Sequence, residues 1–387
     1  MFHNQFILIK YTINTMQEKQ KVTEEKNLIA AFPGKYIQGQ NALAELPKLI
    51  KLLGKKGLII ASPTAKSKIL TKCDFIKSNK DWIITEKFNG ECSQKEISRI
   101  KGIIAKQNID VVIGMGGGKV IDTAKVSADM AGLPVIIVPT IASNDAPCSG
   151  CAVIYTEEGV VESVYYQKIN PQVVLVDTNI IAEAPVRFLV AGMGDALATW
   201  FEARSCERAQ SGNECGGYST MTGLALARLC YDTLLQYGPT AKIACENKIV
   251  TPALNRIIET NILLSGIGFE SSGLAAAHSI HNGLSAIKET HAYYHGEKVS
   301  FGVVAGLHLT DALPDEMNTV YSFCEQLGLP TTFAQIGIKN VKKEKLMEAA
   351  VKACAPEESI HHEAVRISPD KVFDAMVAAD AMGRLRK

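Results

Sequence analysis

The sequence predicts an α/β half built on a parallel sheet, followed by a half made only of helices. Two observations predict this fold class. As far as residue 177, short apolar runs such as 57–61, 111–114 and 173–177 alternate with longer stretches of helical periodicity. From Arg187 onward, apolar residues recur with a helical period and β-branched runs are almost absent. Strands separated by helices of this length form a parallel sheet that is covered on both faces.

The expected elements follow one another in a regular order. Strands are expected at 35–37, 57–61, 82–87, 111–114, 134–138 and 173–177, and helices of the first half at 42–53, 65–77, 94–107 and from residue 119. Helices of the second half are expected at 197–206, 218–235, 257–266, 273–287, 299–309 and 345–354. Single cores stop growing at roughly 250–300 residues, and this chain is longer. We therefore expect two domains, residues 29–184 and 185–387, after a polar extension at residues 1–28.

Composition excludes several classes of partner. Lys plus Arg number 41 against 40 for Asp plus Glu, and no basic cluster is interleaved with aromatic residues, so we expect no nucleic acid partner. No apolar run approaches the roughly 20 residues needed to span a bilayer, and the first residues lack the features of a signal peptide. We expect a cytoplasmic protein without a membrane partner. Its ten scattered cysteines suit a reducing compartment.

A glycine-rich turn follows the apolar run 111–113. Glycine occupies positions 114, 116, 117 and 118, and Lys119 then begins a helical pattern. Glycines remove the Cβ atoms that would keep an anion off the backbone, so the free N–H groups of a helix start can point at a phosphate. The spacing matches neither G-x-G-x-x-G nor a P-loop. A tight turn between a strand and a helix, which also favours glycine, therefore stays open as an interpretation.

A second set of residues suggests a metal site. Asp195 falls in the first turn of an expected helix, where capping is the alternative role. His278 and His281 are three residues apart on one helix face, and His295 precedes another helix. One carboxylate and two imidazoles form a three-ligand site that leaves a position for water or substrate, as in catalytic zinc sites and those of other divalent metals. The spacing does not choose between His278 and His281.

Five ordered motifs between residue 28 and the C-terminus carry a resemblance to a known family. They are GMGGGKVIDTAK, IIVPTIASNDAP, VLVDTNIIAEAPVRFLVAGMGDALATWFEARSC, AAAHSIHNGL and HGEKVSFG. With these motifs the chain resembles the metal-dependent, iron-containing type of alcohol dehydrogenase, and within that family the branch of glycerol dehydrogenases. The resemblance implies a dehydroquinate synthase-like architecture with a nucleotide-binding domain and a helical metal-binding domain. It also implies NAD and a catalytic zinc in the cleft between them, and a homo-oligomer.

The resemblance assigns roles to individual residues. The implied metal ligands are Asp195, His278 and His295, so that His281 lies beside the ligands or in the cleft. Asp145 matches a contact to a substrate hydroxyl, although a turn role within Ser-Asn-Asp-Ala-Pro is the alternative. The implied cofactor-binding residues are Gly116, Gly117, Gly118, Lys119, Asp122, Thr140, Ser143, Ser149, Cys151 and Tyr155.

The implied reaction is reversible hydride transfer from the secondary hydroxyl of glycerol to NAD, which gives dihydroxyacetone. An Asp145 that accepts a hydrogen bond from a neighbouring hydroxyl would favour a vicinal diol. The acceptor of the hydroxyl proton stays open between bulk solvent and a relay through His281 or His291. The second strand ends at Ala61 without the acidic residue that usually follows it in this family, and Lys66 and Lys68 come soon after. We hypothesise weaker selectivity for NAD and use of NADP, because no carboxylate repels a 2′-phosphate.

Three alternatives accompany this interpretation. The same scaffold acting on another diol, a simple alcohol or a polyol phosphate is the nearest, although we see no cationic cluster for a phosphate near Asp145 or His295. A lyase of the dehydroquinate synthase kind would need several cationic side chains that are not evident in the sequence. A non-catalytic nucleotide-binding descendant would be expected to lose a metal ligand, and all three are present. Oxidation of Cys148 and Cys151, the only C-x-x-C pair, is a separate hypothesis of inhibition.

Overall fold

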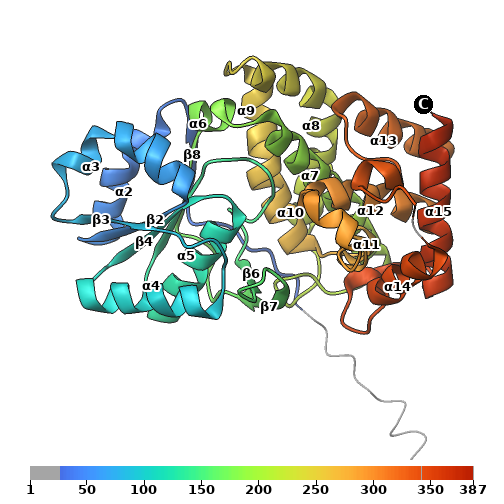
Figure 1. The fold of residues 1–387 in the computed structure, drawn as a ribbon, viewed down its shortest axis with the longest axis horizontal. Helices are drawn as coiled ribbons and strands as arrows, with labels where there is room; N and C mark the ends of the chain where they lie inside the picture. Colours follow the sequence, from blue (N-terminus) through green and yellow to red (C-terminus); the bar gives the residue numbers. More distant parts are fainter. Residues whose placement is uncertain (1–26, 341, 387) are drawn as a thin grey trace, which may run out of the picture.

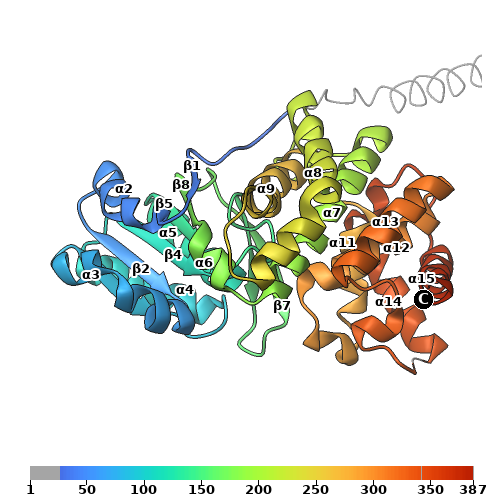
Figure 2. The same cartoon turned by 90° about the horizontal axis from the view of Figure 1, so that it is seen from above.

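The computed structural model describes residues 27–340 and 342–386. Figure 1 shows an α/β half, coloured blue to green, beside a helical half, coloured green to red, and Figure 2 shows the same arrangement from above. The predicted extension, residues 1–28, lies outside the described residues except for its last two. Asn27 O accepts the N–H of Tyr218 at 2.9 Å, and Leu28 forms a parallel bridge with the same residue.

The α/β half contains a six-stranded sheet in which every neighbouring pair is parallel, as predicted. Its order is β1-β8-β5-β4-β2-β3. The strands are β1 (Tyr36–Gly39), β2 (Gly57–Ala61), β3 (Ile83–Lys87), β4 (Val111–Gly116), β5 (Val135–Pro139) and β8 (Val173–Asp177). Every residue of β2, β4, β5 and β8 is buried, which explains their continuous apolar runs.

Helices cover both faces of this sheet (Figure 1). They are α2 (Leu46–Leu53), α3 (Asp74–Ser78), α4 (Gln94–Gln107), α5 (Gly118–Ala131) and α6 (Thr178–Glu183). The single helix expected at 65–77 is wrong, because a π turn, a 3-10 turn and the short α3 occupy this stretch. Hydroxyls there bond to carbonyls four residues earlier, as Thr71 does with Ser67, and such bonds compete with regular helix geometry.

A two-stranded antiparallel hairpin, β6 (Cys151–Tyr155) and β7 (Val161–Tyr166), lies where the two halves meet. The sequence did not predict it. Only alternate residues of β6 are buried and β7 is largely exposed, so neither strand produces the continuous apolar run of the central sheet.

The second half contains no strand among the described residues after Asp177, in agreement with the prediction. Its helices are α7 (Val186–Ala209), α8 (Met221–Glu246), α9 (Pro252–Glu259), α10 (Ser265–Ser272), α11 (Ala276–Leu284), α12 (His295–Leu309), α13 (Pro314–Leu327), α14 (Lys343–Ala353) and α15 (Pro369–Leu385). The sequence did not predict α13 and α15. None of the described helices is both long enough and apolar enough to cross a membrane.

One hydrophobic cluster extends from the α4–α5 side of the sheet into the helical half, with members such as Val112, Ile137, Leu197 and Phe301. A second cluster fills the opposite side of the sheet beneath α2. The shared core holds the carboxyl ends of the strands and the start of α7 in a fixed relation.

Candidate functional site

The glycine turn lies at the carboxyl ends of the strands. β4 ends at Gly116, and α5 begins at Gly118 after an N-cap, Gly117, that offers no capping side chain. β2 connects outward to β3 whereas β4 connects to β5, so the crevice between β2 and β4 is a topological switch point, where open α/β sheets bind ligands. A Cβ on Gly117 would lie 3.0 Å from Ile141 Cδ1. The start of α5, whose N–H groups have no capping side chain, therefore packs closely against the loop after β5.

The loop after β5 runs over the glycine turn. It carries two of the predicted cofactor residues, Thr140 and Ser143, and the N–H of Thr140 donates to Gly116 O at 3.0 Å. A Cβ on Gly118 would lie 2.9 Å from Asn144 Nδ2. The loop and the helix start approach each other so closely that a side chain at Gly118 would displace the amide of Asn144.

Three other predicted cofactor residues surround the first turns of α5. Lys119 forms an ion pair with Glu91, and its ammonium lies 5.2 Å from the centroid of the Tyr155 ring. Asp122 instead turns into the protein, where one oxygen accepts the N–H of Val153 at 3.2 Å. Burial raises the pKa of Asp122 to about 6. Lys119 and Tyr155 thus lie together, and Asp122 fixes the hairpin behind them.

A buried lysine, Lys125, holds the segment that carries the predicted residues Ser149 and Cys151. Its ammonium donates to the carbonyl of Ala146, to the carbonyl of Cys151 at 2.8 Å and to Ser149 Oγ at 3.3 Å. Burial raises the pKa of the Cys151 thiol to about 12 and also raises that of Cys148. Both thiols stay protonated at neutral pH, and the thiolate is the form that oxidants attack.

Asp145 occupies the position between the glycine turn and the helical half. Its Oδ2 accepts a hydrogen bond from Ser265 Oγ at 3.2 Å, and Ser265 in turn contacts Thr199 Oγ1. Burial raises the pKa of Asp145, and the nearby Asp195 raises it further. Asp145 therefore directs a carboxyl group toward the surroundings of Asp195 while its neighbour Asn144 touches the glycine turn.

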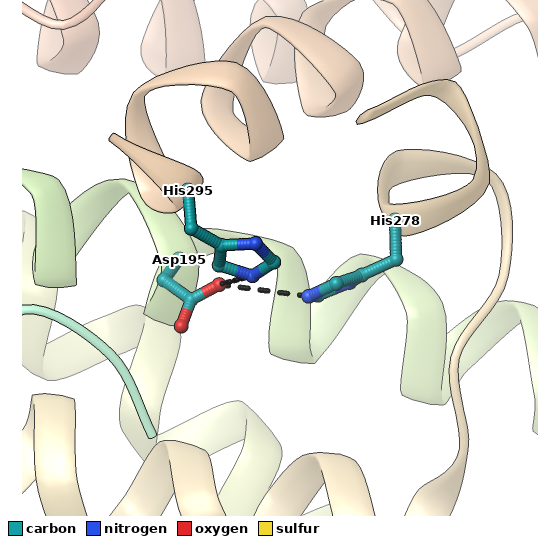
Figure 3. Close-up of side chains that lie close together, drawn as sticks. All are labelled: Asp195, His278 and His295. Carbon is teal, nitrogen blue, oxygen red and sulfur yellow. Dashed lines mark ion pairs between the residues drawn. The ribbon is translucent and has the colours of Figure 1, made fainter. Parts of the chain in front are cut away.

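The three predicted metal ligands converge in the helical half (Figure 3). His295 Nε2 lies 3.0 Å and His278 Nε2 lies 3.5 Å from Asp195 Oδ1, and one ligand atom of each residue lies within 4.8 Å of the others. We call Asp195, His278 and His295 the metal cluster. The start of α12 meets α7 so closely that only glycine fits at position 296. A Cβ there would lie only 1.8 Å from the carbonyl oxygen of Ala191.

The predicted location of Asp195 in the first turn of a helix is wrong. α7 begins at Val186, so Asp195 lies in the helix interior and cannot cap it. The sequence obscured this because Gly192 and Gly194 interrupt the apolar pattern. Both glycines instead permit close approach: a Cβ on Gly192 would lie 2.0 Å from Ala142 O, and one on Gly194 would lie 2.4 Å from Gly296 O.

The donor set of the metal cluster fits a divalent cation. Both carboxylate oxygens of Asp195 are buried and accept no hydrogen bond from any described residue, although His295 Nε2 approaches closely. Burial alone would raise the pKa of Asp195, but the two histidines overcome this effect and hold it below its ordinary value. A buried carboxylate without donors is costly unless a cation compensates it. Two imidazoles and one carboxylate are ligands that zinc and similar metals accept.

Each histidine of the metal cluster has a neighbouring side chain at its other ring nitrogen. His278 Nδ1 lies 2.6 Å from Glu202 Oε2, which leaves Nε2 facing Asp195. His295 Nδ1 lies 3.2 Å from His281 Nε2. The geometry thus brings His278 Nε2 toward Asp195, whereas His281 contacts the other ring nitrogen of His295. The spacing in the sequence had left the choice between His278 and His281 open. His291 is directed elsewhere, with its Nε2 2.9 Å from the carbonyl of Ser285.

Sequence reasoning missed three residues that organise the site: Lys125, Glu202 and Glu270. All three are buried charged residues on helices with many apolar neighbours. Charged residues are rarely buried without a specific partner. A charged residue at a position where the helical pattern predicts burial was therefore the signal in the sequence that could have identified them.

Comparisons with known proteins show which sequences and structures this chain resembles. The family model described as "Iron-containing alcohol dehydrogenase" matches residues 33–178. The chain is 51% identical to a glycerol dehydrogenase of Thermotoga maritima over 92% of this chain and 98% of the relative. It is 42% identical to a glycolaldehyde reductase of Halobacterium salinarum over 91% of this chain and 97% of the relative. The structure of a probable glycerol dehydrogenase from Sinorhizobium meliloti is 41% identical, covers 93% of this chain and 100% of that one, and has a TM-score of 0.88.

Proposed function

The chain belongs to the iron-containing alcohol dehydrogenase family as an NAD-dependent, metal-containing enzyme of the glycerol dehydrogenase type, and from this premise we propose its substrate, its metal and the roles of its residues. The proposed reaction is the reversible oxidation of glycerol at its secondary carbon: glycerol and NAD⁺ give dihydroxyacetone, NADH and a proton. The proposed metal is zinc, held by Asp195, His278 and His295.

One juxtaposition carries this proposal. Asn144 contacts Gly118 at the glycine turn, and the next residue, Asp145, is bonded to Ser265 near Asp195. Two adjacent residues thus connect a proposed pyrophosphate site with a proposed metal site. Hydride transfer needs the cofactor and the alcohol to be held next to each other, and a short loop between the two sites supports such an arrangement.

The residues of the metal cluster bind and orient the substrate end of the reaction. A divalent cation held by one carboxylate and two imidazoles supplies Lewis acidity, which lowers the pKa of a hydroxyl that it contacts. Asp145, oriented by Ser265, accepts a hydrogen bond from the adjacent hydroxyl of a vicinal diol. An alcohol with a single hydroxyl lacks this second contact, so a diol is preferred.

The α/β half holds the cofactor. The uncapped N–H groups at the start of α5 would receive the pyrophosphate, with Lys119 and its partner Glu91 beside them. Thr140 and Ser143 lie along the cofactor, and Ser149, Cys151 and Tyr155 lie on its nicotinamide side. Asp122 supports these residues by accepting the N–H of Val153, and we assign it no direct contact with the cofactor.

A second candidate substrate is a 2-hydroxyaldehyde. The relative named glycolaldehyde reductase supports it, because it is 42% identical over nearly its whole length. A 2-hydroxyaldehyde and glycerol share two oxygens on neighbouring carbons, and Asp145 can accept a hydrogen bond from either. The similarity to these relatives favours glycerol and a 2-hydroxyaldehyde over a polyol phosphate substrate and over a lyase reaction.

We also propose that the enzyme is a cytoplasmic homo-oligomer. Exposed apolar residues gather on and beside the β6–β7 hairpin, including Val160, Val161 and Ile169, each at least 60% exposed. Several exposed apolar residues on and beside one hairpin favour an interaction site there. Light scattering on purified protein measures the subunit number, and a monomer at micromolar concentration contradicts this proposal.

A spectrophotometric screen tests the function. Glycerol, other vicinal diols, simple alcohols and, in the reductive direction, glycolaldehyde and dihydroxyacetone are assayed with NAD and NADP cofactors before and after chelator treatment. We expect the highest turnover with glycerol, loss of activity on chelation and recovery on addition of zinc. Activity that resists chelation, or that is highest with a simple alcohol, contradicts the proposal.

A further inference from the structure

Glu202 is a fully buried carboxylate that contacts one residue of the metal cluster. It is 1% exposed and lies on α7, the helix that also carries Asp195. Its Oε2 lies 2.6 Å from His278 Nδ1, and its Oε1 accepts the N–H groups of Ala275 at 2.9 Å and His278 at 3.0 Å. We infer that Glu202 is a positioning residue that sets the affinity of the metal cluster for its cation. The inference rests on the proposed function.

The first step concerns the tautomer of His278. An ionised carboxylate only accepts hydrogen bonds, so the hydrogen of a neutral His278 ring must lie on Nδ1, the atom that faces Glu202. Nε2 then keeps its lone pair, and this is the atom that lies 3.5 Å from Asp195 Oδ1. Glu202 thus presents the ring in the one neutral form that can bind a cation at the cluster.

The second step concerns the direction of the ring. The same carboxylate bonds both to the ring and to the backbone N–H of His278, so it fixes the side chain relative to its own main chain. The bonded N–H groups belong to the start of α11, where the helix dipole favours a negative charge. Asp195 and Glu202 both lie on α7. This helix therefore positions Asp195 directly and His278 through its contact with Glu202.

His295 has no comparable anchor. Its Nδ1 lies 3.2 Å from His281 Nε2, and its side chain is 41% exposed, compared with 13% for that of His278. Neither ring in this pair imposes a tautomer on the other, since a neutral imidazole can donate or accept at this position. His278, held by Glu202, is therefore the more firmly oriented of the two histidines in the metal cluster.

The chain provides a matched control in Glu363. This carboxylate is also buried, at 9% exposure, and it supports the same helix start. Its Oε1 accepts the N–H of Ala276 at 3.1 Å, and its Oε2 accepts a hydrogen bond from Ser205 Oγ at 2.6 Å. Among the described residues, it forms no hydrogen bond or ion pair with a histidine of the metal cluster. Replacement of Glu363 therefore reports the effect of loosening α11 without altering the ring of His278.

The decisive variant is Glu202→Gln. Its amide oxygen can still accept from the two backbone N–H groups, but its NH₂ group then donates to His278 Nδ1 and moves the ring hydrogen to Nε2, the ligand atom. If the amide turns over, the NH₂ group faces two backbone donors instead. Glu202→Asp is a second variant, which keeps the charge at the helix start but withdraws it from the ring.

The experiment measures zinc affinity of the full chain by competition with a chromophoric chelator. We expect the affinity of Glu202→Gln and Glu202→Asp to fall about 10- to 100-fold, in the range found when a partner of a metal ligand is replaced. Glu363→Gln should keep the wild-type affinity. With Co²⁺ in place of zinc, the visible absorption spectrum should change in the Glu202 variants and not in Glu363→Gln.

Two outcomes overturn the inference alone: wild-type affinity in both Glu202 variants, or equal losses in the Glu202 and Glu363 variants, which would indicate a general loosening of α11. Circular dichroism of the metal-free proteins establishes that each variant is folded, and Glu202→Asp decides if the glutamine variant does not fold. A wild-type protein without affinity for zinc overturns the proposed metal site together with this inference.

Discussion

The backbone N–H of Gly150 donates to Glu270 Oε1 across 2.6 Å and joins the segment before the hairpin to α10 of the helical half. The other oxygen of Glu270 accepts a hydrogen bond from Asn170. Lys125 holds the same segment from α5, and Ser265 holds Asp145 at its start. Residues 145–151 are therefore fixed from both halves of the molecule. This buried polar network keeps the proposed substrate contact in register with the nucleotide side.

Replacement of Lys125 by methionine should destabilise the protein. Methionine fills a similar volume but leaves the carbonyls of Ala146 and Cys151 without their donor, at about 1–3 kcal/mol for each unsatisfied buried group. Urea denaturation measures the loss in free energy of unfolding. The exposed Lys101 on α4 provides the control, because Lys101→Met should stay within about 0.5 kcal/mol of wild type. Equal stability of the two variants would show that the hydrogen bonds of Lys125 do not stabilise the segment 145–151.

Local patterns predicted some elements well. The range 94–107 matches α4, where Ser93 accepts the N–H of Glu96 as an N-cap and Asn108 ends the helix in the left-handed conformation. The central strands β2 and β8 also match their predicted ranges, because burial on both faces makes their apolar runs continuous. These signals are encoded within a few residues of the element that they define.

The details of the site depend on residues that are distant in sequence. The place of His278 in the metal cluster follows from Glu202, which is 76 positions away. The glycines of α7 made Asp195 resemble a helix start, whereas they are required by contacts with Ala142 and Gly296. The hairpin also escaped prediction because only alternate residues of β6 are buried and β7 is largely exposed. No local pattern specifies such contacts.

Gly118→Ala should weaken cofactor binding. The new Cβ would lie 2.9 Å from Asn144 Nδ2, and it would occupy the approach to the uncapped N–H groups of α5. We expect the KM for NAD to rise about tenfold, which corresponds to about 1.4 kcal/mol. The control is Gly102→Ala on α4, where a Cβ meets no atom within 4 Å. An unchanged KM in Gly118→Ala would show that the cofactor phosphates bind elsewhere.

Asp122 should make the stability depend on pH in an unusual direction. Burial raises its pKa to about 6 in the folded protein, whereas an unfolded chain has an Asp pKa of about 3.9. The folded state binds the proton of Asp122 more tightly than the unfolded state does. The resulting stabilisation of the fold is complete at pH values below the unfolded pKa, and it is lost as the pH rises through the folded pKa. The stability of Asp122→Asn relative to wild type should therefore rise by up to about 3 kcal/mol between pH 4 and 7. Denaturant titrations that give a pH-independent difference contradict the assignment.

Cofactor choice should be permissive. Ser62 follows β2, and its Oγ accepts the N–H of Ala65 at 3.1 Å, so no carboxylate occupies the position that would repel a 2′-phosphate. We expect kcat/KM with NADP to lie within about tenfold of that with NAD. Ser62→Asp, which retains an oxygen acceptor for Ala65, should shift the ratio toward NAD. A strong wild-type preference for NAD excludes this hypothesis.

The central claim is that Asp195, His278 and His295 hold the cation on which turnover depends. Asp195 is buried with the ring nitrogens of His278 and His295 close to its Oδ1, so Asp195→Asn removes the negative charge of the site while keeping a side chain of the same size. The most direct measurement is zinc content by mass spectrometry and glycerol oxidation on the same preparations of wild type and Asp195→Asn. We expect stoichiometric zinc and turnover in wild type and the loss of both in a folded variant. An Asp195→Asn protein that retains its zinc and full activity would contradict it.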